Sequence, residues 1–175
     1  PYAHARITRI TTTQAQKLPG VVGVFTAADL KGEVNNVPCA WPVTNANIKT
    51  PPYPPLAKDV VRYAGEAVAV VVAETPSIAE DARDLVEVEY DPLPVVVDSE
   101  AAVKKGAPQL HAEAPGNVSF EWKIAGGDVD AVFKEADVVL SQRFVNQRLQ
   151  PSAIEPRAAI AQYDPGTKEL KVHVT

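Results

Sequence analysis

The sequence predicts an α+β fold, with a mixed sheet built on a strand–helix–strand unit and the first antiparallel strands of a second domain after it. Two patterns carry this prediction: the apolar period changes twice within residues 60–98, and alternating apolar residues run from Val138 to the end of the chain. The 175 residues are 46% hydrophobic and 22% charged, values that are ordinary for a globular domain with a normal core.

The strand–helix–strand unit begins with the continuous apolar run at residues 67–73. Because this run is rich in valine and is bounded by polar residues, it predicts a strand that is covered on both faces. Thr75 stands where a helix N-cap belongs. Pro76 follows at the first helical position, where its missing N–H removes no hydrogen bond.

The helix and the second strand of the unit follow from two different spacings. Ile78, Ala82 and Leu85 lie at i, i+4 and i+7, which gives one apolar stripe along a helix. From residue 86 the period changes to two, as Val and Tyr alternate with Glu87 and Glu89, so a half-exposed strand is expected over residues 86–90. Asp91 and Pro92 should end that strand.

The N-terminal residues predict further short elements in the order strand, helix, strand and turn. Residues 5–11 form an imperfect strand alternation, and residues 21–25 a second strand. Between them, Thr12 or Thr13 can cap a short helix over residues 14–18 that ends at Pro19-Gly20. Residues 26–30 are expected to form a single helical turn.

Residues 31–59 have no sustained period and six prolines, so they predict a long loop. A loop of this length inside a domain is usually functional or covered by a partner. Trp41 and Tyr53 lie within it. We expect these aromatic rings to pin the loop onto its own domain, and docking on a neighbouring domain is the alternative.

Four elements are expected after the central unit: a helix over residues 99–105, an extended segment over 106–117, a strand over 120–124 and a helix capped by Asp128. The apolar stripe of the last helix is Val129, Val132, Phe133 and Ala136. The preceding Gly126-Gly127 pair lacks the glycine spacing and the Lys-Ser/Thr of a phosphate-binding loop, so it is expected to lead into the cap only.

The end of the chain predicts three strands at residues 138–149, 154–163 and 170–174 that form an antiparallel meander. Asp164 to Thr167 carry the proline and glycine of a turn between the last two. We place a domain boundary between Gly127 and Asp137, which gives domains at residues 1–127 and 128–175.

Charge and cysteine content exclude several classes of function. The net charge of −5 and the absence of Lys/Arg clusters argue against nucleic acid or an anionic membrane as the partner. No apolar run approaches the roughly 20 residues of a membrane span. The single Cys39 excludes an internal disulfide and a cysteine-ligated iron–sulfur cluster, and we expect it to be an inert loop residue.

The residues offer few candidates for catalysis. His4, His111 and His173 lack zinc-site spacing, and the paired carboxylates Glu87/Glu89 and Glu80/Asp81 fall on solvated faces. Two polar groups stand inside strand-like segments, at residues 146–148 (Asn-Gln-Arg) and 155–157 (Glu-Pro-Arg). We expect them to form an interdomain network of hydrogen bonds or ion pairs. The alternative is that they hydrogen-bond to the residues that contact a cofactor and hold those residues in place.

Several segments in order carry a family resemblance. They are VRYAGEAVAVVVAET with AEDARDLVEVEYDPLPVVVD, PYAHARI, LPGVVGVFTAADL, GAPQLH, PGNV and FVNQRLQPSAIEPRAAIAQYDP. Together they resemble the large, molybdenum-binding subunit of the xanthine dehydrogenase, aldehyde oxidase and aerobic carbon monoxide dehydrogenase family. The resemblance covers nearly all of the chain and identifies its first part as the α/β hammerhead domain.

The resemblance implies oxidative hydroxylation of a carbon centre, or oxidation of carbon monoxide, at a molybdenum held by molybdopterin, in its cytosine dinucleotide form. It implies water as the oxygen source and a glutamate as general base. It also implies partner subunits that carry FAD and [2Fe–2S] clusters, a dimer of the large subunit, and a bacterial cytoplasmic location. The wording FVNQRLQPSAIEPR leans toward carbon monoxide dehydrogenase-like members, with xanthine dehydrogenase-like members as the other expectation.

No catalytic, cofactor-binding or metal-binding residue is carried over, because the family's motifs for these roles lie beyond the matching segments. The chain has no methionine and ends inside a strand-like run, so we expect an inactive scaffold piece of a longer protein whose bare strands associate. Two other functions stay open: a non-catalytic binding module with the hammerhead fold, and a small enzyme that uses Glu155 with His173.

Overall fold

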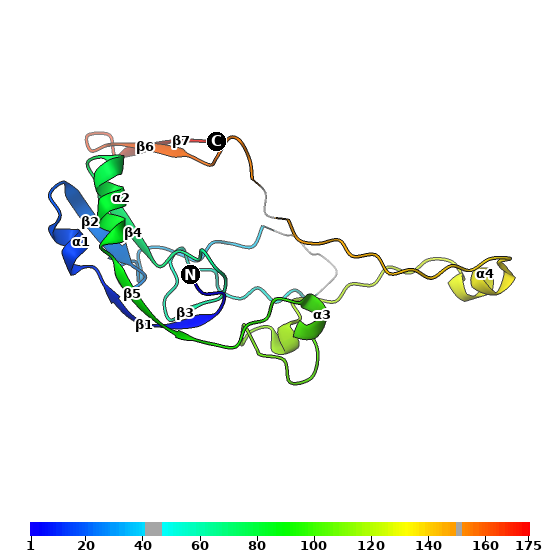
Figure 1. The fold of residues 1–175 in the computed structure, drawn as a ribbon. Helices are drawn as coiled ribbons and strands as arrows, with labels where there is room; N and C mark the ends of the chain where they lie inside the picture. Colours follow the sequence, from blue (N-terminus) through cyan, green and yellow to red (C-terminus); the bar gives the residue numbers. More distant parts are fainter. Residues whose placement is uncertain (41–46, 150–151) are drawn as a thin grey trace. The chain divides into compact units, whose positions relative to one another are not determined.

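The computed structural model describes residues 1–40, 47–149 and 152–175. The chain divides into an N-terminal unit, Pro1–Ala125, and a C-terminal unit, Gly126–Thr175 (Figure 1). The α+β class is confirmed. The expected mixed sheet is not found in the described part of the chain, where the strands form three small antiparallel sheets.

The N-terminal unit holds five strands and three α-helices within its described residues. The strands are β1 (Ala5–Thr11), β2 (Val21–Thr26), β3 (Val60–Val61), β4 (Ala69–Ala73) and β5 (Glu87–Pro92). The helices are α1 (Thr13–Lys17), α2 (Pro76–Asp84) and α3 (Ser99–Ala102), and a 3-10 turn, η1, spans Pro115–Asn117.

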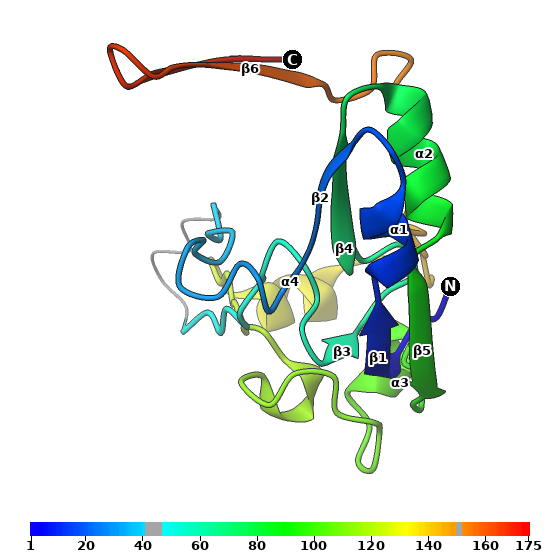
Figure 2. The ribbon, with the colours of Figure 1, turned by 90° about the vertical axis from the view of Figure 1, so that its left-hand side faces the viewer.

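One core of this unit lies between two helices and a two-stranded sheet. Strands β2 and β4 pair with Val24 opposite Val71, and α1 and α2 lie on one side of them (Figure 2). The core residues are Ala15 from α1, Val24 from β2 and Ala82 from α2. Because both helices contribute alanine, whose side chain is a single methyl group, they approach each other and the sheet closely.

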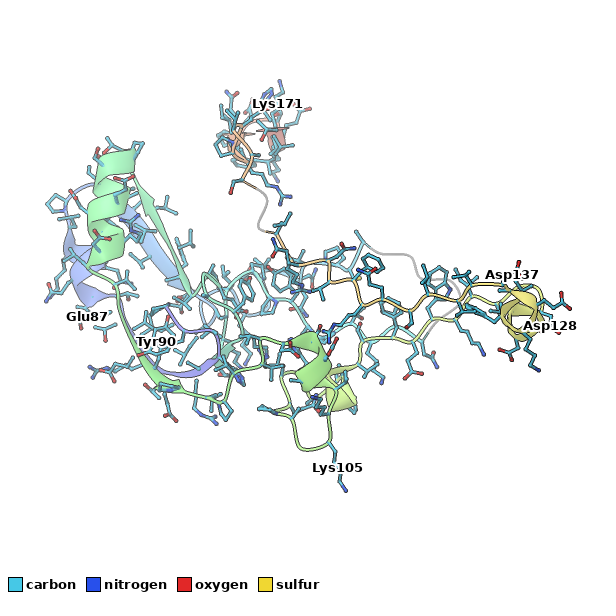
Figure 3. All side chains as sticks on the ribbon, turned by 45° about the vertical axis from the view of Figure 1, so that its right-hand side comes forward. Glu87, Tyr90, Lys105, Asp128, Asp137 and Lys171 are labelled. Atoms are coloured by element: carbon cyan, nitrogen blue, oxygen red, sulfur yellow. The ribbon has the colours of Figure 1, made fainter. Side chains whose placement is uncertain are left out.

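A second core lies on the three-stranded sheet, whose order is β3-β1-β5. Ala5, Ala57 and Val61 are buried there, with Tyr90 packed against them. The ring of Tyr90, which is labelled in Figure 3, is tilted against that of Tyr2 at a centroid distance of 5.3 Å. Across the same ladder Arg9 forms an exposed ion pair with Glu89, in agreement with the half-exposed strand predicted there.

The helix of the central unit is confirmed in detail. The Thr75 hydroxyl accepts a hydrogen bond from the backbone N–H of Ile78 at 3.3 Å, and Pro76 is the first helical residue. Its two flanking strands, however, do not lie in one sheet. Strand β4 pairs with β2 whereas β5 pairs with β1, so the helix connects the two sheets.

The prediction that residues 67–73 are covered on both faces is wrong for this chain. Val70 and Val72 are 44% and 43% exposed. The reason is that α1 and α2 cover one face of the β2–β4 sheet, and the side chains on the other face of β4 stay half-exposed. Val22 and Phe25 of β2 are exposed as well.

Residues 106–117 form a closed loop instead of the extended segment that was predicted. The Asn117 side chain accepts a hydrogen bond from Leu110 N–H at 3.0 Å and donates to the carbonyls of Ala102 and Pro108, both at 2.9 Å. These bonds pull the ends of the loop together. Helix α3 ends at Ala102, short of the predicted residue 105, and residues 120–124 form no strand.

The C-terminal unit contains α4 (Val129–Glu135), β6 (Ala159–Asp164) and β7 (Glu169–Val174). The predicted cap is confirmed, since Asp128 accepts a hydrogen bond from Ala131 N–H at 3.0 Å. The predicted turn is confirmed too, because Asp164 accepts from Gly166 N–H at 2.8 Å. The expected three-stranded meander is a two-stranded hairpin, because the described residues at 138–149 form no strand and β6 begins at Ala159.

The hairpin has one apolar face and one largely polar face. Its register pairs Ala159 with Val174, Ala161 with Val172 and Tyr163 with Leu170, and these six side chains share one face. All six residues are exposed. The sequence-based expectation of bare strand surface at the end of the chain is therefore confirmed.

Candidate functional site

The long loop at residues 31–59 is tied to the N-terminal unit by backbone hydrogen bonds. Ala57 N–H donates to the Ala67 carbonyl at 2.7 Å and Ile7 N–H to the Asp59 carbonyl at 2.9 Å, while Val37 N–H donates to the Tyr53 carbonyl at 2.8 Å and joins the two halves of the loop to each other. Leu56 and Ala57 are buried. The second half of the loop therefore has a fixed course along its own unit.

Tyr53 is bonded within its own unit, as predicted. Its hydroxyl lies 2.9 Å from the hydroxyl of Tyr63, which follows β3 just after the end of the loop. This hydrogen bond, followed by burial, raises the pKa of Tyr63 to about 12, because ionisation removes the proton with which Tyr63 donates to Tyr53 and leaves a charge in a partly desolvated position. The expectation for Trp41 concerns a residue that lies outside the described residues.

Two hollows open along this loop. The first, of about 510 Å³, is bordered by Val37, Ile48, Lys49, Pro51 and Tyr53 among others. The second, of about 490 Å³, lies between the turn after β2 and the proline pair at residues 54–55. Asn36 borders both of them, so they share a wall. Volumes of this size are typical of sites that bury a ligand or several side chains.

The described rim of these hollows carries positive charge only. Lys49 borders the first hollow, Lys31 and Lys58 border the second, and no Asp or Glu is among their described lining residues. Lys58 lies 3.7 Å from Asp59, a contact between two well-exposed groups that is worth little. The surface is thus apolar with a cationic edge, in a chain whose net charge is −5.

A smaller polar cavity of about 140 Å³ lies beside Arg62, Glu66, His111 and Glu113. Glu66 accepts a hydrogen bond from the backbone N–H of Arg62 at 2.6 Å, and Arg62 Nε donates to the Leu110 carbonyl at 3.0 Å. Burial, together with the charge of Arg62, lowers the pKa of His111. Through Arg62 and Leu110, the cluster joins the segment that follows β3 to the loop at residues 106–117. A structural role therefore explains why these polar residues lie together.

The other predicted candidates do not come together in a site. His4 is buried with Nδ1 2.7 Å from the Pro94 carbonyl, and His173 is exposed on β7. Cys39 is exposed at the first hollow. The carboxylates Glu80, Asp81, Glu87 and Glu89 are exposed, as expected; Glu87 is labelled in Figure 3. Across the part of the chain that the structure describes, no three His, Cys, Asp or Glu residues could hold a metal ion.

The polar groups at residues 146–148 and 155–157 are exposed in irregular segments. Glu155 and His173 are exposed as well, whereas a catalytic acid–base pair is expected to lie in a cleft. The interdomain network remains a prediction. No helix among the described residues is long and apolar enough to cross a membrane.

Sequence reasoning missed the cationic hollows. A signal was present, because residues 31–58 contain three lysines and one acidic residue, Glu33, in an otherwise acidic chain. The spacing of these lysines, at positions 31, 49 and 58, is irregular, so only the folded loop shows that they border adjoining hollows.

Comparison with protein families decides the assignment. Residues 1–94 match the family described as aldehyde oxidase and xanthine dehydrogenase, a/b hammerhead domain. The chain belongs to this family. Residues 110–175 match the molybdopterin cofactor-binding domain, so both expected parts of the fold are found in the expected order. The predicted family and hammerhead fold are confirmed.

Individual relatives agree with this assignment. The nicotine 6-hydroxylase large subunit of Paenarthrobacter nicotinovorans is 38% identical over the whole chain, which covers 21% of that relative. The carbon monoxide dehydrogenase large chain of Afipia carboxidovorans is 36% identical over 97% of the chain and 22% of its own length.

Among solved structures, quinoline 2-oxidoreductase from Pseudomonas putida 86 matches with a TM-score of 0.87 and 37% identity, over 98% of this chain and 22% of that one. The present chain thus spans about a fifth of the length of the relatives it matches.

Proposed function

We propose that this chain is the hammerhead domain and the first part of the cofactor-binding domain of the large subunit of a molybdenum-dependent hydroxylase. The observation that carries the proposal is the consecutive match to both domain families, in order, across one chain. The reaction class would convert RH and water to ROH with release of two electrons and two protons. The parent protein would be an oxidoreductase.

The described residues do not by themselves fit a bound molybdenum cofactor. They contain no cluster of metal-ligating side chains, and nearly every described side chain of the C-terminal unit is exposed. A cofactor site needs ligands and dipoles held by surrounding structure. We therefore assign this chain a scaffold role and no catalytic, cofactor-binding or metal-binding residue, and we expect it to be inactive by itself.

The cofactor of the parent protein would be molybdenum–molybdopterin, in the cytosine dinucleotide form that the family resemblance implies. FAD and [2Fe–2S] clusters would be carried by partner subunits, and the large subunit would form a dimer. The name of one relative, 6-hydroxypseudooxynicotine dehydrogenase complex subunit gamma, supports a multi-subunit assembly.

We place the domain boundary between Gly127 and Asp137, with domains at residues 1–127 and 128–175. The division of the structure at Ala125 supports a position close to this, while the cofactor-binding match already begins at residue 110. Limited proteolysis of the purified chain tests the placement. Cleavage is expected at residues 126–137 first, and early cleavage inside residues 106–117 would move the boundary.

For the substrate we favour a nitrogen heteroaromatic ring over carbon monoxide. Relatives named for nicotine and quinoline are 38% and 37% identical to the chain. The alignment with a carbon monoxide dehydrogenase large chain from Hydrogenophaga pseudoflava runs over 190 positions. Since the chain has 175 residues, at least 15 of those positions have no counterpart here. The alignment with the nicotine relative, by contrast, runs over 175 positions, and this agreement in length supports the heteroaromatic class. The alternatives are the carbon monoxide dehydrogenase-like activity toward which the sequence analysis leaned and xanthine dehydrogenase-like activity.

The test is to express the protein from its complete reading frame with its neighbouring genes. Metal analysis should find molybdenum in the large subunit, and a dye-linked assay should show oxidation of quinoline or nicotine but not of carbon monoxide. Oxidation of carbon monoxide alone would replace the substrate proposal. A purified protein without molybdenum or redox activity would favour the remaining alternative, a binding module with the hammerhead fold.

A further inference from the structure

We propose that residues 106–117 form a pH-sensitive clasp, in which protonation of His111 weakens the hold of this loop on the segment at residues 62–66, just after β3. The clasp lies where the two family matches meet, since the hammerhead match ends at residue 94 and the cofactor-binding match begins at residue 110. It therefore joins a part of the chain that matches one domain family to the start of the part that matches the next. The inference goes beyond the proposed function and does not depend on it.

Two amide side chains hold the clasp in its closed form. The Asn117 side chain joins the two ends of the loop. The Gln109 side chain donates to the carbonyls of His111 and Ala114, both at 2.7 Å, and accepts from Gly116 N–H at 3.0 Å. Because these bonds fix the backbone on both sides of His111, its ring has a defined place as long as the loop is closed.

One hydrogen bond from a charged side chain ties the clasp to the segment after β3. Arg62 Nε donates to the carbonyl of Leu110, the residue before His111, at 3.0 Å. Arg62 and His111 are both half-buried and border the same polar cavity of about 140 Å³. The guanidinium that holds the loop is therefore also the cation that a protonated His111 would meet. Like charges at a partly buried site repel each other more than they would in open water.

The ring of His111 is surrounded by charged and titratable groups from several segments. They are Arg62 and Glu66 after β3, Lys58 and Asp59 before β3, Glu113 on the loop itself and His4 before β1. Burial has the largest influence on the pKa of His111 and lowers it, and the charge of Arg62 lowers it further. Glu113 and Glu66 act in the opposite direction without offsetting these two effects, and His4 adds a smaller lowering. The neutral ring is thus the form that the closed clasp favours.

Acid consequently favours the open loop. In the open form water replaces the buried surroundings of His111 and Arg62 is no longer beside it, so the ring regains its ordinary pKa of 6.5. The open loop then binds the proton more tightly than the closed loop does. The stability of the closed clasp is therefore complete well above pH 6.5 and is lost progressively as the pH falls below that value.

Hydrogen exchange in the purified 175-residue chain measures the clasp directly. The backbone N–H groups of Leu110 and Gly116 donate to the side chains of Asn117 and Gln109, so they are protected while the loop is closed. NMR exchange rates, each divided by the intrinsic rate at the same pH, give protection factors. We expect these to fall at least about threefold from pH 7.5 to pH 5.5, and by no more than about tenfold per pH unit, because one proton is involved. Constant protection factors over this range would overturn the proposal.

An NMR titration of the His111 ring in the same sample needs no substitution. A midpoint below 6.5 is expected, and a midpoint at or above 6.5 would reject His111 as the group that acid acts on. His111→Gln, which is neutral at every pH, should abolish the pH dependence of the protection factors. His173→Gln is the matched control, because His173 is exposed on β7 in the other unit, and it should retain that dependence. A dependence that persists in His111→Gln would contradict the proposal.

A variant on the other side of the clasp tests the role of the guanidinium. Arg62→Gln removes the positive charge and shortens the side chain that reaches the Leu110 carbonyl. It should lower the protection factors already at pH 7.5 and raise the pKa of His111, a change that the loss of a purely structural bond would not cause. Protection factors and a His111 midpoint equal to those of the unsubstituted chain would show that Arg62 does not hold the loop.

Discussion

The two units of this chain differ in how far each can bury its own apolar side chains. The N-terminal unit closes two small cores, one on each of its sheets, with alanine and valine fully or nearly buried. The C-terminal unit has a clean amphipathic hairpin and a capped helix, yet both its apolar hairpin face and the stripe of α4 are exposed. Correct local structure is therefore not enough for a core; further surface must be supplied to the second unit.

The largest expected difference appears when the units are separated. Residues 1–125 should unfold cooperatively on heating, because both cores lie within that unit. Residues 126–175 should show a coil-like circular dichroism spectrum, since an isolated two-stranded hairpin is marginal in water. Thermal melts of the two fragments measure this. A cooperative transition in the shorter fragment would remove the contrast between the units.

A valine pair measures the same contrast at single residues. Val24 is 5% exposed in β2 and Val172 is 53% exposed in β7. Val24→Ala should lower the free energy of unfolding by about 2 kcal/mol through lost burial and a cavity. Val172→Ala should change it by less than about 0.5 kcal/mol, as surface substitutions usually do. Urea denaturation of the whole chain gives both values, and equal losses would mean that the hairpin is buried in solution.

A glycine pair separates backbone strain in the two units. Gly20 has φ +87° and Gly127 has φ +70°, both in the region that favours glycine. A Cβ at Gly20 would also lie 2.6 Å from Ile78 Cδ1, which would have to move. Gly20→Ala should lower the free energy of unfolding by about 1–2 kcal/mol. Gly127→Ala should leave the same transition unchanged, and a comparable shift would indicate that the units unfold together.

The smallest expected effect is a pH dependence confined to the N-terminal unit. The pKa of Tyr63, at about 12, lies above the ordinary value of 10.0 that the unfolded chain would show. The folded state therefore holds this proton more tightly. Its contribution to stability is complete below pH 10 and is lost as the pH rises toward 12. Tyr53→Phe removes the hydroxyl partner and should lower the pKa of Tyr63, as measured by phenolate absorbance. In the C-terminal unit, Tyr163→Phe should leave the Tyr63 titration unchanged.

Features that depend on near neighbours could be predicted from the sequence. The caps at Thr75 and Asp128, the turn at Asp164 and the strands at Ala5–Thr11, Val21–Thr26 and Glu169–Val174 are set by side chains within a few residues. The family assignment was also within reach, because many matching segments stand in order. The two hollows along the loop were not, since Lys31, Lys49 and Lys58 come to border them only after the loop folds back on its unit.

The sequence by itself determined the capped starts of α2 and α4, the turn at Asp164 and the amphipathic strands β1, β2 and β7, because spacing and capping act over a few residues. Tertiary structure alone decided which strands pair and which surfaces stay open. The apolar run at residues 67–73 predicts a strand with both faces covered, yet helices cover only one face of β4. Residues 138–149 have the alternation of a strand but no partner within the described chain. A strand is completed by neighbours that are distant in sequence, and apolar alternation cannot say where those neighbours are.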